Sequence, residues 1–216
     1  AGRMQDSQDL LTQADQAIGD GDHGVGMARG FAAVQVKLEA SPPATVADLL
    51  RHSAGLAAHR EFYRQAKGHS AIVARAIAEP LEYEPGTNIL YSDLDFMILG
   101  EIIRQVTGEP LDRIASREIF QPLGMNDTLF RPARRLRSRI APTEDDTAWR
   151  KRQVWGEVHD QNAFAMGGVA GHAGLFSTAG DLAVFCQMLL NGGIYAHRRL
   201  LSRAAIDQFT SRYTIA

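Results

Sequence analysis

Residues 82–111 read EYEPGTNILYSDLDFMILGEIIRQVTGEPL, and their second half carries a strong helical pattern. Glu84-Pro85-Gly86 favours a turn, and an amphipathic helix is predicted over 93–107, ended by Gly108. The apolar residues of this helix recur at helical spacing: Phe96, Leu99, Ile103 and Val106. We expect this stripe to pack against a second amphipathic helix that carries Leu182, Phe185, Cys186 and Leu189.

The remainder of the chain also has helical patterns and few convincing strands. Predicted helices cover 5–17, 27–39, a short apolar run capped by Thr45, 61–79, 110–122, 178–190 and about 202–210. Thr178-Ala179-Gly180-Asp181 has the pattern of a capping box. The break in composition at Ser41-Pro42-Pro43 predicts two units, residues 1–43 and 44–216.

Composition restricts the classes of function. The chain has 216 residues, a net charge of −2 and a pI near 6.4, which gives no general reason to expect nucleic acid or a membrane surface as a partner. No run reaches the roughly 18 apolar residues of a membrane span. The N-terminus is polar and acidic, unlike a secretory signal, so a cytoplasmic location is expected as the chain stands. The chain begins at Ala1, which leaves a processed start open.

Cys186 is the single cysteine, which excludes an internal disulfide and a cysteine-based metal site within the chain. Because it lies in an apolar helical pattern, we expect it to be a small buried residue.

Three aspartates surround a glycine-rich loop near the start of the chain. Asp15, Asp20 and Asp22 are separated by loop glycines that include Gly21, so their carboxylates can converge. Hard cations such as Mg²⁺ prefer several oxygen ligands, and helix N-termini suit phosphates. The alternative is an acidic turn that only caps a helix.

The longer string ADQAIGDGDHGVGMARGF, residues 14–31, resembles the ADP-binding L subunit of dihydroxyacetone kinase. The resemblance implies that Asp15, Asp20 and Asp22 hold Mg²⁺ against nucleotide phosphates, with His23 and Gly21 at the phosphate loop. It covers only about the first forty residues. Without the supporting helices of that family, we expect weak binding of Mg²⁺ and ADP.

From about Thr45 onward the chain resembles the serine β-lactamase and penicillin-binding-protein-like hydrolases. The matching strings follow one another in the order of that family: TVADLLRHSAGL, EYEPGTNILYSDLDFMILGEIIRQVTGEPL, IFQPLGMNDT and GGVAGHAGLFSTAGDLAVFCQMLLNGG. The resemblance implies a partial α+β fold that is mainly α-helical in this chain. It contains the helical lobe and part of the core, preceded by a helix–loop–helix of different origin.

The same resemblance implies acyl transfer through a Ser-x-x-Lys, a Tyr-x-Asn and a Lys-Thr-Gly or His-x-Gly, with no cofactor. Tyr91-Ser92-Asp93 stands at the second position. Tyr91 can relay a proton, whereas Asp93 replaces an amide donor with a carboxylate, which only accepts hydrogen bonds when ionised. Esterase-like or peptidase-like substrates, small molecules or peptides, therefore remain open.

The first catalytic element has no match. The lysines are Lys37, Lys67 and Lys151, and none has a serine three residues before it. Ser53 has no base one helical turn away, so a structural role is favoured.

The third element has no convincing match either. His172-Ala173-Gly174 is followed by a capped helix where the family has a strand. His159-Asp160 carries metal-capable side chains without partners at ligand spacing, so a loop ordered by its backbone is favoured.

Three functions remain in competition. The chain is a hydrolase-family segment that is inactive alone, a Mg²⁺–ADP-binding unit of a phosphotransferase, or a non-catalytic module that pairs with a partner chain. Apolar helix faces that pack on the sheet of that family are expected to be exposed and to favour self-association or partner binding.

Overall fold

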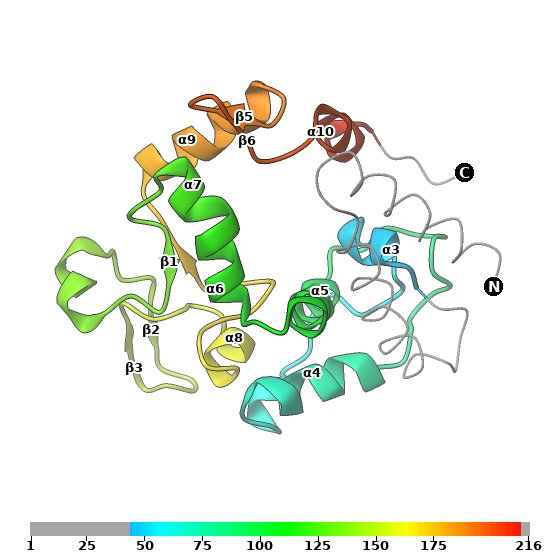
Figure 1. The fold of residues 1–216 in the computed structure, drawn as a ribbon. Coiled ribbons are helices and arrows are strands. Elements are labelled where there is room, and N and C mark those ends of the chain that lie inside the picture. Colours follow the sequence, from blue (N-terminus) through cyan, green and yellow to red (C-terminus); the bar gives the residue numbers. More distant parts are fainter. Residues whose placement is uncertain (1–43, 213–216) are drawn as a thin grey trace.

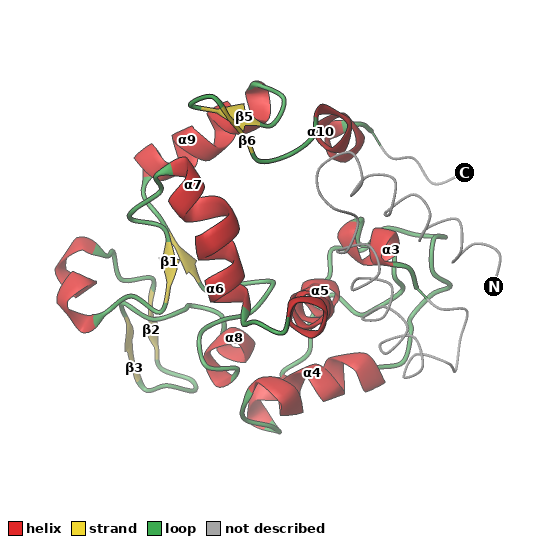
Figure 2. Cartoon of the chain, viewed as in Figure 1, coloured by secondary structure: helices red, strands yellow, loops and turns green. Residues whose placement is uncertain are grey.

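A computed structural model describes residues 44–212, which are mainly helical, as expected (Figures 1 and 2). The helices in chain order are α3 (Val46–Leu50), η1 (Phe62–Arg64), α4 (His69–Ala78), α5 (Asp93–Thr107), α6 (Leu111–Ala115), η2 (Ser116–Phe120), α7 (Gln121–Leu123), η3 (Arg134–Arg139), α8 (Gln161–Ala165), α9 (Ala179–Leu190) and α10 (Arg203–Thr210). The helices predicted over 5–17 and 27–39 lie outside the described residues.

Strands in the described range are short and form separate antiparallel pairs. They are β1 (Leu129–Phe130) with β4 (Leu175–Phe176), β2 (Glu144–Asp146) with β3 (Arg152–Val154), and β5 (Ile194–Tyr195) with β6 (Arg198–Arg199). In the first pair Leu129 lies opposite Phe176. This pair joins the segment after α7 to the segment before α9, so it links two distant parts of the sequence.

Most of the predicted helix boundaries are confirmed. Helix α5 covers the predicted residues 93–107 and ends at Gly108, whose φ of 70° is the left-handed conformation that glycine adopts most easily. The predicted helix over 61–79 is divided instead. A 3₁₀ turn at Phe62–Arg64 precedes α4, and Gly68, with a φ of 94°, separates them.

Helix caps explain where α3 and α9 begin. Thr45 and Asp48 form a complete capping box at α3. At α9 only half of the predicted box forms: Thr178 accepts a hydrogen bond from the Asp181 amide. The Asp181 carboxylate instead accepts from the Asp127 amide and the Thr128 hydroxyl, at 2.9 and 2.7 Å. Asp181 thus ties the start of α9 to the segment before β1.

The larger hydrophobic cluster forms around α5, which packs against α3 and α4. The predicted apolar stripe is wrong as the most buried face of the helix, although Leu99 is buried and Phe96 and Val106 pack against this cluster. The most deeply buried apolar residues of α5 are Leu94, Met97, Ile98 and Ile102, whereas Ile103 is 36% exposed and Phe96 only partly buried. The helix is apolar on more than one face because neighbours cover several of its sides, so the spacing alone did not fix the buried face.

The expected packing of α5 on α9 is also wrong. Helix α9 contributes to a second hydrophobic cluster, with Ala115, Phe120, Leu123 and Met125 from the α6–α7 region. Only Met188 of α9 is buried, and Cys186, expected inside, is exposed. Figure 1 shows α9 beside α7, with the α6–α7 segment between α9 and α5.

A glycine pair brings the loop over residues 167–174 onto α5. A Cβ atom on Gly171 would lie 2.0 Å from the Phe96 carbonyl oxygen, and one on Gly100 would lie 3.1 Å from the Gly171 amide nitrogen. Two side chains at these positions would prevent the backbones from touching. The predicted glycine-rich loop is therefore a packing element against the central helix.

Among residues 44–212, none of the helices has the length and apolar character that crossing a bilayer requires.

Candidate functional site

The Tyr91-Ser92-Asp93 segment precedes α5 and is fixed by hydrogen bonds to residues 52–58. The Leu90 amide donates to the His52 carbonyl oxygen, and the Asp93 amide donates to the Ala58 carbonyl oxygen, both at 2.9 Å. Ser92 is buried, and its hydroxyl donates to the Ala57 carbonyl oxygen at 2.7 Å while capping α5. Ser92 thus anchors the segment, with the exposed Tyr91 before it and the half-buried Asp93 after it.

The Tyr91 ring contacts a neighbouring aromatic ring, and its hydroxyl stays accessible to solvent. The side chain is 68% exposed. Its ring lies 4.7 Å from the His52 ring, centroid to centroid, and His52 in turn stacks on Phe96 at 5.0 Å. Such ring contacts orient an aromatic side chain without using its polar end. Tyr91 can therefore offer its hydroxyl to a molecule outside the protein.

The half-buried His52 and the buried Asp95 form a pair behind Tyr91. His52 Nδ1 accepts a hydrogen bond from the Ser92 amide and lies 3.6 Å from Asp95 Oδ2. The Asp95 side chain is 1% exposed, and neither of its oxygens makes a hydrogen bond within the described part of the chain. Burial, with a smaller contribution from the Asp48 charge, raises the pKa of Asp95 to about 7. Burial lowers the pKa of His52. His52 therefore favours its neutral form near neutral pH, whereas Asp95 changes between its neutral and ionised forms in this range.

Asp93 lies in a cluster of polar side chains that no sequence pattern brought together. His59 Nδ1 is 3.1 Å from Asp93 Oδ2. Asp160 joins this pair, and each of the three residues offers a ligand atom within 4.8 Å of the others. Their separation in sequence exceeds 30 residues at each step, so only the folded topology could show their proximity.

His159-Asp160 and His172 were considered separately from sequence, but Asp160 and His172 in fact interact. His172 Nε2 lies 2.9 Å from Asp160 Oδ1, and the His172 side chain is 2% exposed. Burial opposes ionisation of Asp160, but the hydrogen bond and charge of His172 and the amide of Ala163 outweigh it and lower the pKa of Asp160. His159 lies apart, 4.0 Å from Glu144.

The His172-Ala173-Gly174 segment does not form an exposed catalytic strand within the described residues. The two-residue strand β4 follows it, and α9 begins soon afterwards. With its side chain buried against Asp160, His172 supports the loop rather than lining an open wall.

Ser53 has the structural role that was favoured from sequence. It is fully buried, and its hydroxyl donates to an Asp48 carboxyl oxygen at 3.1 Å. A serine in this position reaches no substrate. The five residues predicted to bind Mg²⁺ and nucleotide, Asp15, Asp20, Gly21, Asp22 and His23, lie outside the described residues.

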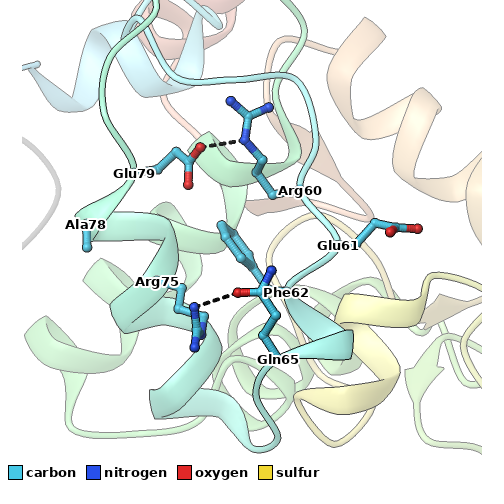
Figure 3. Close-up of a pocket in the computed structure, with 7 residues that line it drawn as sticks. All are labelled: Arg60, Glu61, Phe62, Gln65, Arg75, Ala78 and Glu79. Atoms are coloured by element: carbon cyan, nitrogen blue, oxygen red, sulfur yellow. Dashed lines mark hydrogen bonds and ion pairs between the residues drawn. The ribbon is translucent and has the colours of Figure 1, made fainter.

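A small pocket between residues 60–65 and α4 is separate from the Tyr91 loop. Figure 3 shows Arg60 paired with Glu79 at one side and Arg75 donating to Gln65 at the other. None of the lining residues is Tyr91 or a member of the Asp93 cluster. Glu61, which also lines the pocket, pairs with Arg64, so each charged lining group has a partner.

The mainly helical fold and the exposed tyrosine before α5 agree with the resemblance to serine β-lactamase-like hydrolases. The chain belongs to the β-lactamase family, whose model matches residues 35–215. The family resemblance from Thr45 onward is thus confirmed, and the match begins before the predicted boundary at Pro43.

Curated relatives extend this result. The chain is 40% identical over 188 residues to a "Putative D-alanyl-D-alanine carboxypeptidase" of Escherichia coli (strain K12), which covers 77% of this chain and 43% of the relative. A protein of the same description from Salmonella typhi is 37% identical over 196 residues, covering 82% and 45%. The chain therefore spans less than half the length of these relatives.

Solved structures show the same fold at low identity. FmtA from Staphylococcus aureus superimposes with a TM-score of 0.62 at 17% identity, covering 82% of this chain and 46% of that one. A β-lactamase/D-alanine carboxypeptidase from Pseudomonas syringae gives 0.58 at 21% identity, covering 78% and 44%. The described residues therefore have part of this fold.

Proposed function

We propose that residues 44–216 are the part of a serine acyl-transfer hydrolase that carries Tyr91 and Asp93 at the reaction centre. The observation that carries this proposal is the position of Tyr91. It is an exposed phenol at the start of α5, with its ring held by His52 and its following residue buried. A tyrosine that moves a proton in acyl transfer needs an accessible hydroxyl on a rigid support.

Asp93 gives the proposed centre a different chemistry from a Tyr-x-Asn enzyme. Its carboxylate, 3.1 Å from His59 Nδ1, can accept hydrogen bonds or bind a cation, whereas an amide can also donate. This favours peptides or esters that present a donor at that point. Two curated relatives carry the description "Putative D-alanyl-D-alanine carboxypeptidase", which is consistent with a peptide substrate.

The chain lacks a Ser-x-x-Lys, so we expect it to form no acyl-enzyme by itself. Its buried serines support this, since Ser53 and Ser92 donate their hydroxyls to neighbouring oxygens. Loss of the nucleophile lowers turnover on the order of 10⁶-fold in a serine hydrolase. Incubation with a fluorescent penicillin and with a fluorophosphonate, followed by intact-mass measurement, should show no stoichiometric adduct.

An adduct on any serine would overturn this expectation, and peptide mapping would then identify the true nucleophile. If no adduct forms, co-purification of the chain from its source tests the alternative, a module that obtains its serine from a partner chain.

A proposal of different origin concerns residues 1–43 as a separate unit that binds Mg²⁺ and ADP through Asp15, Asp20 and Asp22. This proposal rests on the sequence string over residues 14–31 alone, because the relatives reported above give no evidence for it. It stays a prediction. The paired change Asp20→Asn and Asp22→Asn removes this candidate site, and the metal titration below uses it for that reason.

A further inference from the structure

We infer that His59, Asp93 and Asp160 form a binding site for a divalent transition-metal ion such as Zn²⁺, beside the Tyr91 loop. One imidazole nitrogen and two carboxylate oxygens lie within 4.8 Å of one another. Zn²⁺ binds such atoms at about 2.0–2.2 Å, so a small inward movement of the side chains would place all three around one ion.

The three ligands stand on segments that are tied together by hydrogen bonds. The Asp93 amide donates to the Ala58 carbonyl oxygen, next to His59. Asn162, in α8 beside Asp160, is fully buried and bonds the backbone of the same segment. Its side chain accepts from the Tyr63 amide and donates to the Arg60 carbonyl oxygen, at 2.9 and 2.8 Å. The backbone thus brings His59 between two carboxylates from distant parts of the chain.

A buried histidine orients one of the two carboxylates, in the way that outer residues of metal sites orient their ligands. Asp160 Oδ1 accepts from the Ala163 amide at 2.6 Å and interacts with His172 Nε2 at 2.9 Å. Among residues 44–212, Asp160 Oδ2 has no hydrogen-bond partner, so it is available to a ligand. His172 is 2% exposed, and its Nδ1 likewise has no partner, so its role is confined to Asp160.

The chemistry of the cluster favours a cation. Two carboxylates and two imidazoles meet here, and carboxylate oxygens and imidazole nitrogens are ligands that Zn²⁺ prefers. Arg60, the cation next to His59 in sequence, is paired with Glu79 and Glu82 instead. Asp93 and Asp160 are 21% and 19% exposed and His59 is 43% exposed, so an ion has access and can keep water as a further ligand.

The structure provides a matched control in a second histidine–carboxylate pair. His159 lies 4.0 Å from Glu144 and is 53% exposed, but in the range 44–212 it has only this one carboxylate partner. His159→Gln therefore removes an accessible imidazole without touching the three proposed ligands.

The experiment is isothermal titration of the full chain with ZnCl₂, with the Asp20→Asn, Asp22→Asn variant as background. We expect one Zn²⁺ per chain. His59→Gln and Asp93→Asn, each added to the background, should weaken binding at least about 10-fold. His159→Gln should leave binding unchanged. Circular dichroism identifies any variant that fails to fold, and Co²⁺ absorption spectra of the background protein give a second measure of the same ligand set.

Three outcomes would overturn the inference: no binding at 1 mM Zn²⁺, background-like binding by His59→Gln and Asp93→Asn, or an equal loss in His159→Gln. The last outcome means general binding by surface histidines. Because the readout is binding of the metal alone, its failure is independent of whether the chain takes part in acyl transfer.

Discussion

Asp95, which lies beside the His52 ring that contacts Tyr91, should make the stability of the folded protein depend on pH. Its buried carboxyl has a pKa raised to about 7, whereas an aspartate in an unfolded chain ionises near 3.9. The protonated carboxyl therefore contributes stability that is complete below about pH 4. This contribution is lost progressively as the pH rises through 7, because the folded protein must then bury a charge.

We predict that Asp95→Asn, which keeps the shape and removes the ionisation, becomes more stable relative to the wild type as the pH rises. Between pH 4.5 and pH 8 the difference in unfolding free energy should change by on the order of 2–4 kcal/mol in favour of the variant. Urea unfolding across this range measures it. Asp145→Asn, which removes an exposed carboxyl on β2, is the control. Parallel pH curves for the wild type and Asp95→Asn would show that Asp95 is ionised in the folded protein.

At the scale of elements, the contact between the 167–174 loop and α5 depends on glycine. Gly171→Ala would place a Cβ atom 2.0 Å from the Phe96 carbonyl oxygen, and backbone cannot move as easily as a side chain. We predict a loss of about 2 kcal/mol or more in unfolding free energy. Gly180→Ala is the control, because its Cβ atom would meet only Thr178 Oγ1, at 3.8 Å, in the exposed first turn of α9.

Chemical denaturation measures the unfolding free energy of both variants relative to the wild type. Gly180→Ala should be neutral or more stable by up to about 1 kcal/mol, because alanine favours helix more than glycine does. Equal effects at the two positions would mean that the loop moves aside from α5 without cost.

The elements differ in how well local sequence determines them. The ends of α5 and the start of α9 were predictable because Gly108 and Thr178 act within one helical turn. The buried faces of these helices were not predictable, because they depend on which other helices pack against them. Met97 and Ile98 face the core only once α3 and α4 pack on α5. The same holds for the candidate site: Tyr91 and Asp93 follow from a local motif, but His59 and Asp160 reach Asp93 only through the fold.

At the scale of the whole molecule, α9 leaves two large apolar side chains, Leu182 and Leu190, exposed to solvent. Leu182, Cys186 and Leu190 recur every four residues, which places them along one face, and Leu182 and Leu190 are 49% and 80% exposed. The sequence pattern predicted burial of this helix, and its other face does pack, through Met188. An exposed apolar stripe of this kind favours contact with another apolar surface. If the chain self-associates, as the sequence predicts, we expect α9 to provide the contact.

We predict that the wild-type chain associates at high concentration through this face and that Leu182→Glu with Leu190→Glu weakens association about 10-fold or more. Each copy would lose two leucines from the contact and gain two charges there. Sedimentation measures the association. Gln187→Glu is the control, because it adds charge to the same helix without removing apolar surface.

Cys186 reports independently on which face is covered, since it lies between the two leucines and is exposed in the single chain. Its rate of reaction with a thiol reagent should fall as the wild-type concentration rises. In the double variant the rate should stay constant, because the stripe no longer meets a partner. If the wild type associates while Cys186 remains equally reactive, the contact uses another surface, and the apolar stripe of α9 is not what holds the copies together.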